Sequence, residues 1–466
     1  MSLLPIQPNF DEGFTPENDI FGRKKLYKQI KNIASMSSDD SIVLGLDDEW
    51  GNGKTSFVKM VVGEVKKYES DNINVIYFDA FKNDYQSDPL LAMLASIYSM
   101  IQLEENNEGF KDNFLKVSKA VALSMLKHTP KAVVSLLSSK LISNEVYDQI
   151  KDTVTDALSE PLEKFIEEKI EGASKEANEI ESFKSVLENI YTSTGKKTLF
   201  IIDELDRAKP DFSLGIIEKV KHLFDVRGFC FLLVMNRSQF EETIKLTYGN
   251  INTSIYLNKF IHMWFKLPIL KTIRVTGSNL DENSNYLFDI FSKYIGIYIK
   301  NQHINRSLSY LLACSSLSLR EAERCVSLYK LCYSSEDSGR LKLFESYAIS
   351  ILIFSRVKSI DLMTGFLHKE KYNDEFKKEL MLSGDTNNIC SNLHALIDYH
   401  YCDDATLTAL FEKNKTHINA SRLRPIEDEL RNIVNTSEAY ERYTINNWKV
   451  HVFEKLSENM EYVDLS

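Results

Sequence analysis

The segment that most constrains the fold of this chain is a glycine-rich turn, GNGKT, at residues 51–55. It follows a short apolar run of strand length at residues 41–46 and opens a helical pattern at residues 56–67. A turn between a buried strand and a helix exposes successive backbone N–H groups, and these groups attract phosphate together with the helix N-terminus. The pattern therefore predicts a phosphate-binding loop, and the alternative is a solvated turn of the same composition.

The residue types of this turn suit a nucleoside triphosphate bound with Mg²⁺. Gly51 and Gly53 let the backbone close around a β-phosphate. Lys54 can reach the β- and γ-phosphates, and the Thr55 hydroxyl can ligate the metal. The residues expected to contact the nucleotide here are Gly51, Asn52, Gly53, Lys54, Thr55 and Ser56.

One position departs from the usual pattern of a glycine, four residues and Gly-Lys-Thr. Asp48 stands where the first glycine is expected. Asp tolerates left-handed backbone geometry better than most residues, so the loop can still form. Asp47, Asp48 and Glu49 nevertheless place three acids near a polyanion, which is unfavourable unless their side chains point away. A loop weakened in this way is one alternative to an active site.

A second motif is the acid pair Asp203 and Glu204, which ends a buried apolar run. A carboxylate at the end of such a strand lies at the carboxyl edge of a sheet, where Asp203 can hold Mg²⁺ opposite Thr55. Glu204 can polarise the attacking water, a role that separates hydrolases from kinases. A solvated strand end is the alternative. Arg207 can form a local ion pair with Asp206 or Glu204, or it can face a neighbouring subunit's nucleotide. We favour the local ion pair.

Five apolar runs of strand length alternate with helical patterns. Near-continuous apolar runs of this kind are typical of a parallel sheet that is covered on both faces. We therefore predict a five-stranded parallel α/β sheet. Its expected strands lie at residues 41–46, 74–79, 198–203, 229–235 and 263–267.

This alternation is interrupted before residue 195 and ends near residue 276. The interruption contains helical patterns without a strand, and its Glu- and Lys-rich part at residues 144–184 suggests a solvated hairpin. Amphipathic helical stretches dominate after the last strand. We therefore divide the chain into a core of residues 1–90 and 195–275, a helical insertion of residues 91–194 and a helical C-terminal domain of residues 276–466.

Composition limits the classes of partner. The chain has 56 Lys and Arg against 67 Asp and Glu, a net charge of −11, which argues against broad nucleic-acid binding but not against a local basic groove. The first residues lack a signal-peptide pattern, and charges interrupt the apolar stretch at residues 120–142, so we expect no membrane span. The six cysteines form no CxxC pair, which is typical of a cytoplasmic protein with reduced thiols.

Together these motifs resemble the KAP family of P-loop NTPases. Trp50 before the glycine loop and the Asp-Arg pair after the metal acid make the match specific. The resemblance implies the additional-strand, catalytic-glutamate type of P-loop fold, in which the strand carrying Asp203 is separated from the one feeding Lys54. The resembling segments are residues 49–57 (EWGNGKTSF), 78–84 (FDAFKND), 200–210 (FIIDELDRAKP), 222–226 (HLFDV) and 256–261 (YLNKFI).

The resemblance also implies cofactors and site residues. ATP and Mg²⁺ are the expected cofactors, with Asp203 on the metal, Glu204 on the water and Trp50 beside the nucleotide. Asn236 falls where related ATPases keep a polar residue that senses the γ-phosphate. The alternative role, a helix N-cap, is equally compatible with its position. Arg320 resembles part of a basic helix after the core and is either a second sensor or one member of a solvated face with Arg–Glu pairs.

The resemblance narrows the function further. Many members of the family carry membrane helices in the insertion, whereas this chain resembles the soluble bacterial members, some of which lie in mobile or phage-defence gene sets. We expect Mg²⁺-dependent ATP hydrolysis used as a regulatory or assembly switch, with protein partners or a homo-oligomer. The alternatives are a non-hydrolysing nucleotide-binding scaffold and a nucleic-acid motor, and the net charge counts against the motor.

Overall fold

The computed structural model contains two compact units, Asn9–Pro268 and Ile269–Ser466, which we call the sheet unit and the helical unit. The structure describes residues 9–36, 41–86, 88–102, 108–126, 178, 180–268, 282–315, 317–333, 343–369, 373–380, 382, 388–401, 453 and 457.

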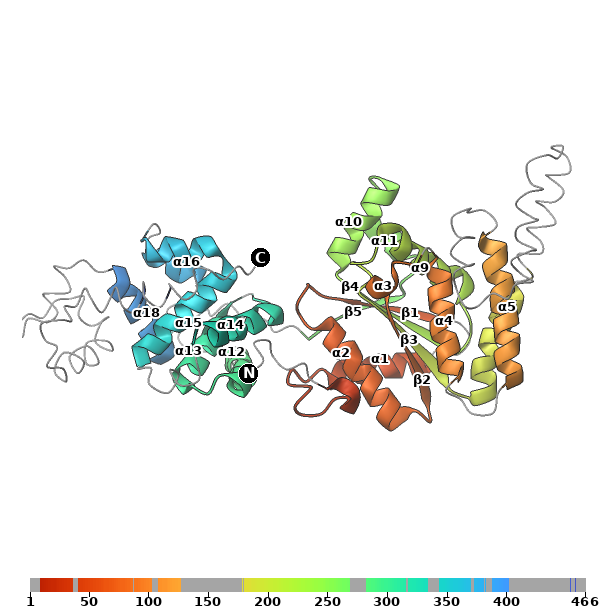
Figure 1. Ribbon diagram of the computed structural model, residues 1–466, viewed down its shortest axis with the longest axis horizontal. Helices are drawn as coiled ribbons and strands as arrows, with labels where there is room; N and C mark the ends of the chain where they lie inside the picture. The colour runs from red at the N-terminus through yellow and green to blue at the C-terminus, as the bar shows by residue number, and fades with distance from the viewer. Residues whose placement is uncertain are drawn as a thin grey trace, which may run out of the picture. The chain divides into compact units, whose positions relative to one another are not determined.

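The sheet unit is built on five parallel strands in the order β2-β3-β4-β1-β5 (Figure 1). Because β4 lies between β1 and β3, the strand that ends in Asp203 is separated from the strand that leads into the glycine loop. This order confirms the additional-strand P-loop fold that the family resemblance implies. The strands are β1 Ile42–Asp47, β2 Ile73–Asp79, β3 Lys197–Asp203, β4 Phe229–Met235 and β5 Met263–Lys266.

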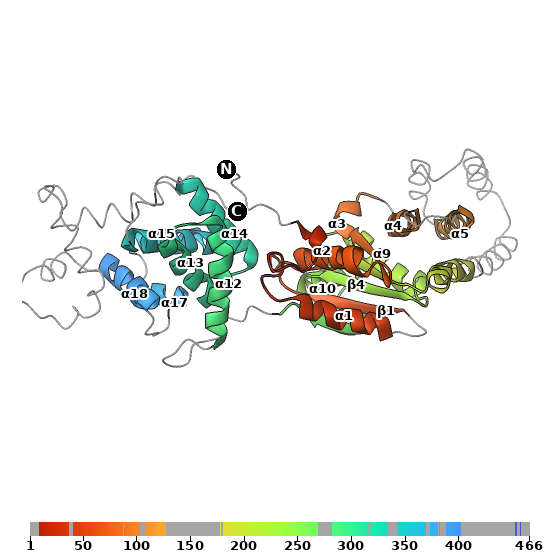
Figure 2. The same cartoon turned by 90° about the horizontal axis from the view of Figure 1, so that it is seen from below.

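Helices cover both faces of this sheet because its central strands are apolar on both sides. All seven residues of β4 are buried. Along β3, Leu199 and Ile201 join one core with α1 and α2, whereas Phe200 and Ile202 join the opposite core with α4, α9 and α10. Figure 2 shows this unit with α1 in front of the strands. The helices and short turns of this unit are η1 Phe10–Glu12, α1 Lys24–Met36, α2 Lys54–Glu64, η2 Val65–Glu69, α3 Ala80–Asn83, α4 Pro89–Gln102, α5 Glu108–Leu126, α9 Pro210–Leu223, α10 Arg237–Tyr248 and α11 Thr253–Leu257.

The expected helical insertion is partly described. Its described residues are α4, α5 and a helical stretch at 180–194, and they contain no strand. Most of the hairpin expected at residues 144–184, and most of the apolar stretch at residues 120–142, lie outside the described residues. No helix in the part that the structure describes combines the length and apolar character needed to cross a bilayer.

The helical unit has its own apolar core. Its helix α15 is buried along most of its length and contacts α13, α14, α16 and α18. Helix α14 begins with a capping box, in which Ser318 and Glu321 each bond the other's backbone N–H. The helices are α12 Glu282–Tyr298, α13 Gln302–Cys314, α14 Leu319–Cys332, α15 Leu343–Lys358, α16 Ile360–Leu367, α17 Asn373–Glu379 and α18 Asn388–Tyr401.

A glycine inside β1 is required by close packing. Gly45 lies opposite Trp264 of β5, and a Cβ at this position would meet ring carbons of Trp264 at 2.4–2.9 Å. The ring cannot yield easily, because Arg237 stacks over its face at 4.7 Å. We expect Gly45→Ala to lower the free energy of unfolding by about 1–3 kcal/mol, measured by urea denaturation.

The matched control is Gly109→Ala in α5, where a Cβ would meet nothing within 4 Å. This change is expected to leave stability unchanged or to raise it by up to about 1 kcal/mol. Equal midpoints for the two variants would contradict the packing argument.

Candidate nucleotide-binding site

The glycine loop connects β1 to α2 and has the backbone geometry that the sequence predicts. Gly51 and Gly53 take positive φ angles of 89° and 82°, and Gly53 is the N-cap of α2. An L side chain would be strained at both positions. Asp48 has no positive φ, so the loop closes without the left-handed conformation that Asp was expected to tolerate there.

The three acids before the loop do not bind the lysine of the loop with their carboxylates. Asp47 Oδ1 accepts the backbone N–H of Arg237 at 2.9 Å. Asp48 Oδ1 accepts the Asn52 side-chain amide at 2.5 Å and the backbone N–H of Glu49 at 2.8 Å, and Glu49 is exposed. The bond between Asp48 and Asn52 therefore connects the residue before the loop to the loop itself.

Lys54 caps the loop through main-chain oxygens. Its Nζ donates to the carbonyls of Asp48 at 2.6 Å and of Glu49 at 3.0 Å. Burial lowers the pKa of the Lys54 ammonium, and the carboxylates of Asp206, Asp48 and Asp203 oppose that shift. The side chain thus holds a partly desolvated positive charge beside the loop, which is the charge that a phosphate group needs.

Asp203 ends β3 as a buried carboxylate, with 1% of its surface exposed. Its Oδ1 accepts the backbone N–H of Glu204 at 2.9 Å, and its Oδ2 accepts the Tyr77 hydroxyl at 3.1 Å. Burial raises the pKa of Asp203 to about 6, although hydrogen bonds from the Glu204 amide, Thr55 and Tyr77 oppose the rise. A bound cation would restore the charged form of this carboxylate.

Glu204 lies across from the first turn of α2. Its Oε1 is 3.5 Å from Thr55 Oγ1 and 3.4 Å from a guanidinium nitrogen of Arg207, which is the local ion pair that the sequence favours. Its φ of 56° is in the left-handed region, which costs a non-glycine residue about 1–2 kcal/mol and is concentrated at functional sites. The glycine loop and the acid pair therefore meet at one rim of the sheet.

Trp50 adds a second link between the same two elements. Its indole Nε1 donates to Asp206 Oδ2 at 2.5 Å, and 46% of its surface remains exposed. The residue is thus available to a ligand beside the loop. Ser56 follows Thr55 in the first turn of α2 and is half-buried.

The residues at this rim fit a magnesium ion that is bound together with a nucleotide. The Thr55 hydroxyl and the Asp203 carboxylate are two adjacent oxygen donors. Among the described residues, no group of three or more His, Cys, Asp or Glu side chains could hold a metal by itself. Mg²⁺ typically takes one or two protein ligands and fills its other positions with phosphate and water, so the donor set suits it.

Asn236 follows β4 and is the N-cap of α10. Its Oδ1 accepts the Ser238 hydroxyl at 2.8 Å and the backbone N–H of Gln239 at 3.4 Å. The N-cap alternative for this residue is thus observed, and its role as a γ-phosphate sensor stays a prediction. Arg320 is exposed on α14 of the helical unit, near Glu323, and its sensor role also stays a prediction.

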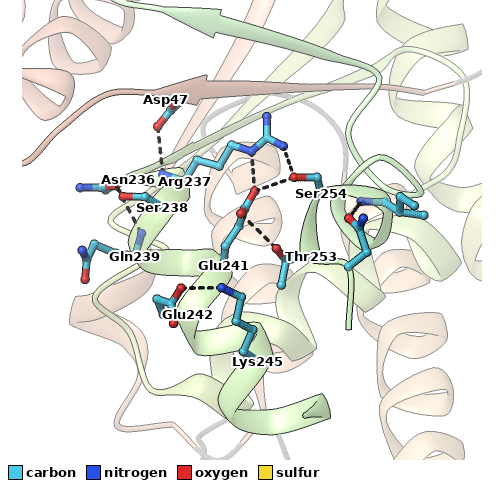
Figure 3. A network of polar contacts seen from close by, with 12 residues as sticks. Asp47, Asn236, Arg237, Ser238, Gln239, Glu241, Glu242, Lys245, Thr253 and Ser254 are labelled. Atoms are coloured by element: carbon cyan, nitrogen blue, oxygen red, sulfur yellow. Dashed lines mark hydrogen bonds and ion pairs between the residues drawn. The ribbon is translucent and has the colours of Figure 1, made fainter. Parts of the chain in front are cut away.

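A polar network anchors the backbone that follows Asn236 (Figure 3). The Arg237 guanidinium donates to Glu241 Oε1 at 2.8 Å and to the Ser254 hydroxyl at 3.0 Å. Burial alone would raise the pKa of Glu241, but hydrogen bonds from Arg237, Thr253 and Ser254 lower it. The network joins α10 to α11 and, through the Arg237 backbone and Asp47, to the end of β1.

Sequence reasoning missed two residues that contact this site, Tyr77 and Arg23. Tyr77 occurs within an ordinary strand pattern, and only the pairing of β2 with β3 brings its hydroxyl to Asp203. Arg23 belongs to no motif that we identified, yet its guanidinium contacts the glycine loop.

A glycine loop that leads from β1 into α2, and an acid pair on the non-adjacent strand β3, define a P-loop NTPase of the additional-strand class. A family model described as "KAP family P-loop domain" matches residues 23–305, more than half of the chain. The chain belongs to the KAP family.

Three individual proteins give distant matches to this chain. The phage T7 exclusion protein of Escherichia coli (strain K12) is 19% identical over 238 residues, which span 51% of this chain and 31% of that protein. Two archaeal replication-protein structures align over 98% of this chain. The Aeropyrum pernix ORC2 protein is 13% identical, with a TM-score of 0.36 and 96% of its chain covered. Cdc6p from Pyrobaculum aerophilum is 12% identical, with a TM-score of 0.40 and 99% of its chain covered.

Proposed function

We propose that this protein hydrolyses ATP in a Mg²⁺-dependent reaction and uses the hydrolysis as a regulatory or assembly switch. The observation that supports this best is the position of Glu204, with its carboxylate 3.5 Å from the Thr55 hydroxyl at the end of the glycine loop. A carboxylate beside a metal-binding hydroxyl is in position to act on water next to a γ-phosphate.

The proposed roles follow from the contacts at the rim. The loop amides and Lys54 bind the phosphates, and Lys54 exchanges its two carbonyl acceptors for phosphate oxygens when nucleotide binds. Thr55 and Asp203 hold Mg²⁺, which neutralises charge on the phosphates. Glu204 orients the attacking water and accepts its proton, while Arg207 holds the Glu204 carboxylate in place.

One observation favours the alternative of a non-hydrolysing scaffold. Asp48 occupies the first glycine position and binds Asn52 across the loop, so a negative charge lies near the place expected for phosphate. If that charge weakens phosphate binding enough, nucleotide is bound without turnover and the protein serves to recruit partners.

Phosphate release from ATP by the purified protein separates these two functions. We expect release that requires Mg²⁺ and falls to background when EDTA is added in excess. Measurable ADP binding with background release under both conditions would support the scaffold instead.

The biological setting is a further part of the proposal. The chain spans 31% of the length of the phage T7 exclusion protein, and that protein's printed name concerns exclusion of a phage. On this basis we propose a switch in bacterial anti-phage defence that acts through protein partners or a homo-oligomer. Loss of phage resistance in a host that carries Glu204→Gln, compared with wild type, would support this role.

A further inference from the structure

A buried arginine lies beneath the glycine loop. Arg23, with 2% of its surface exposed, precedes α1 and donates to two loop carbonyls: one terminal nitrogen to Asn52 O at 2.7 Å and the other to Gly53 O at 3.2 Å. Asp19 accepts the backbone N–H groups of Arg23 and Lys24, which fixes the start of α1. The guanidinium also lies over the Phe21 ring at 4.9 Å.

Both contacts orient the loop peptides, and the Gly53 carbonyl is also held by the backbone N–H of Phe57 at 3.0 Å. In a trans peptide the C=O of one residue and the N–H of the next point in opposite directions within one plane. Holding the carbonyls of Asn52 and Gly53 on the Arg23 side therefore directs the N–H groups of Gly53 and Lys54 to the other side. The N–H of Lys54 opens α2 and has no acceptor within that helix, so it is available to an anion.

Burying the Arg23 guanidinium costs folding free energy, which argues that this residue has a role beyond packing. Burial lowers the pKa of Arg23 to about 10, although the nearby charges of Asp48 and Asp19 oppose this shift. The side chain therefore remains charged at neutral pH. Its Nε is buried without a hydrogen-bond partner, and no described carboxylate forms an ion pair with the guanidinium. A buried cation with incomplete hydrogen bonding lowers the stability of the fold relative to an apolar residue.

We propose that Arg23 is a positioning residue for the nucleotide phosphates, because its hydrogen bonds to the Asn52 and Gly53 carbonyls keep the Gly53 and Lys54 amides directed at the phosphate site. The proposal rests on the nucleotide binding proposed above, and it does not depend on hydrolysis. It concerns how the loop is held, since Arg23 itself contacts only protein.

Titration calorimetry with Mg·ADP tests this role without any need for turnover. Arg23→Gln, which loses the charge and one of the two donors, is expected to weaken binding by about 10- to 100-fold. Arg23→Lys, which keeps the charge and can reach one carbonyl, is expected to lie between Arg23→Gln and wild type. Lys28→Gln, an exposed residue on the same helix, is the matched control and should bind like wild type.

The binding stoichiometry distinguishes positioning from a merely structural role. Positioning raises Kd while every folded chain still binds one ADP. A structural role lowers the fraction of chains that bind and leaves Kd unchanged. If Arg23→Gln does not fold, Arg23→Lys carries the same test.

The failure of this inference can be told apart from the failure of the proposed function. Unchanged Kd in both Arg23 variants would overturn the inference while leaving wild-type nucleotide binding intact. Wild-type protein that binds ADP but releases no phosphate would overturn hydrolysis and leave the inference to be judged by Kd alone. Wild-type protein that binds no ADP would overturn both.

Discussion

Replacing Glu204 by Gln is expected to lower the turnover number for ATP by at least about 100-fold, because removal of a general base typically costs 10²- to 10⁴-fold. Gln has the shape of Glu and keeps an oxygen near Thr55 and Arg207, but it cannot accept a proton from water. Phosphate release at saturating Mg·ATP measures the effect.

Binding of Mg·ATP should survive this change. Glu204 carries a negative charge beside the proposed phosphate site, so its neutralisation leaves affinity unchanged or improves it. Glu242→Gln, an exposed acid on α10 paired with Lys245, is the matched control and should turn over ATP like wild type. Equal turnover by Glu204→Gln and Glu242→Gln would remove Glu204 from the reaction.

Replacing Lys54 by Ala is expected to weaken Mg·ATP binding by about 100-fold or more, and to abolish turnover at ordinary ATP concentrations. The Lys54 ammonium is a charged donor at the loop, and charge-assisted hydrogen bonds to phosphate are about twice as strong as neutral ones. Its loss removes those bonds and a partly desolvated positive charge.

The thermal shift caused by Mg·ATP measures this loss. A ligand at 100 times its Kd stabilises the folded state by about 2.7 kcal/mol, so wild type should melt later with nucleotide, whereas Lys54→Ala should not respond. Lys59→Ala, on the same helix but outside its first turn, is the control and should keep the wild-type response. A full shift in Lys54→Ala would mean that nucleotide binds elsewhere.

The sheet could be predicted from the sequence because its strands carry their own signal. Each of the five expected runs coincides with an observed strand to within about two residues, since near-continuous burial needs near-continuous apolar sequence. Hydrophobic periodicity along the sequence does not determine the order of the strands in the sheet. The family resemblance implied one part of this order, the separation of the Asp203 strand from the Lys54 strand, which the position of β4 between β1 and β3 confirms.

The local parts of the site were also predictable. Gly51 and Gly53 adopt the positive φ angles that a phosphate loop needs, and Arg207 pairs with Glu204 three residues earlier. Both features depend on neighbours in the sequence. The same holds for the N-cap formed by Asn236, whose two hydrogen-bond donors, Ser238 and Gln239, lie within three residues.

The remaining contacts could not be predicted because they join distant segments. Arg23 reaches the loop from 29 and 30 residues away, and Tyr77 reaches Asp203 from 126 residues away. An arginine at the start of a helix and a tyrosine in a strand are common, and only the tertiary fold gives these two their neighbours. The bond from Asn52 to Asp48 joins residues only four apart, and it was missed because it depends on how the loop closes.

We propose that the glycine loop and the acid pair act on one magnesium-bound nucleotide. The most direct test is the ratio of ATP dissociation constants with excess EDTA and with saturating Mg²⁺, measured by calorimetry in Glu204→Gln to prevent turnover. Because Asp203 is proposed to hold the metal, we expect Mg²⁺ to tighten ATP binding by at least about 10-fold, and we expect the added Asp203→Asn change to bring the ratio close to one. A ratio that Asp203→Asn leaves unchanged would contradict the account.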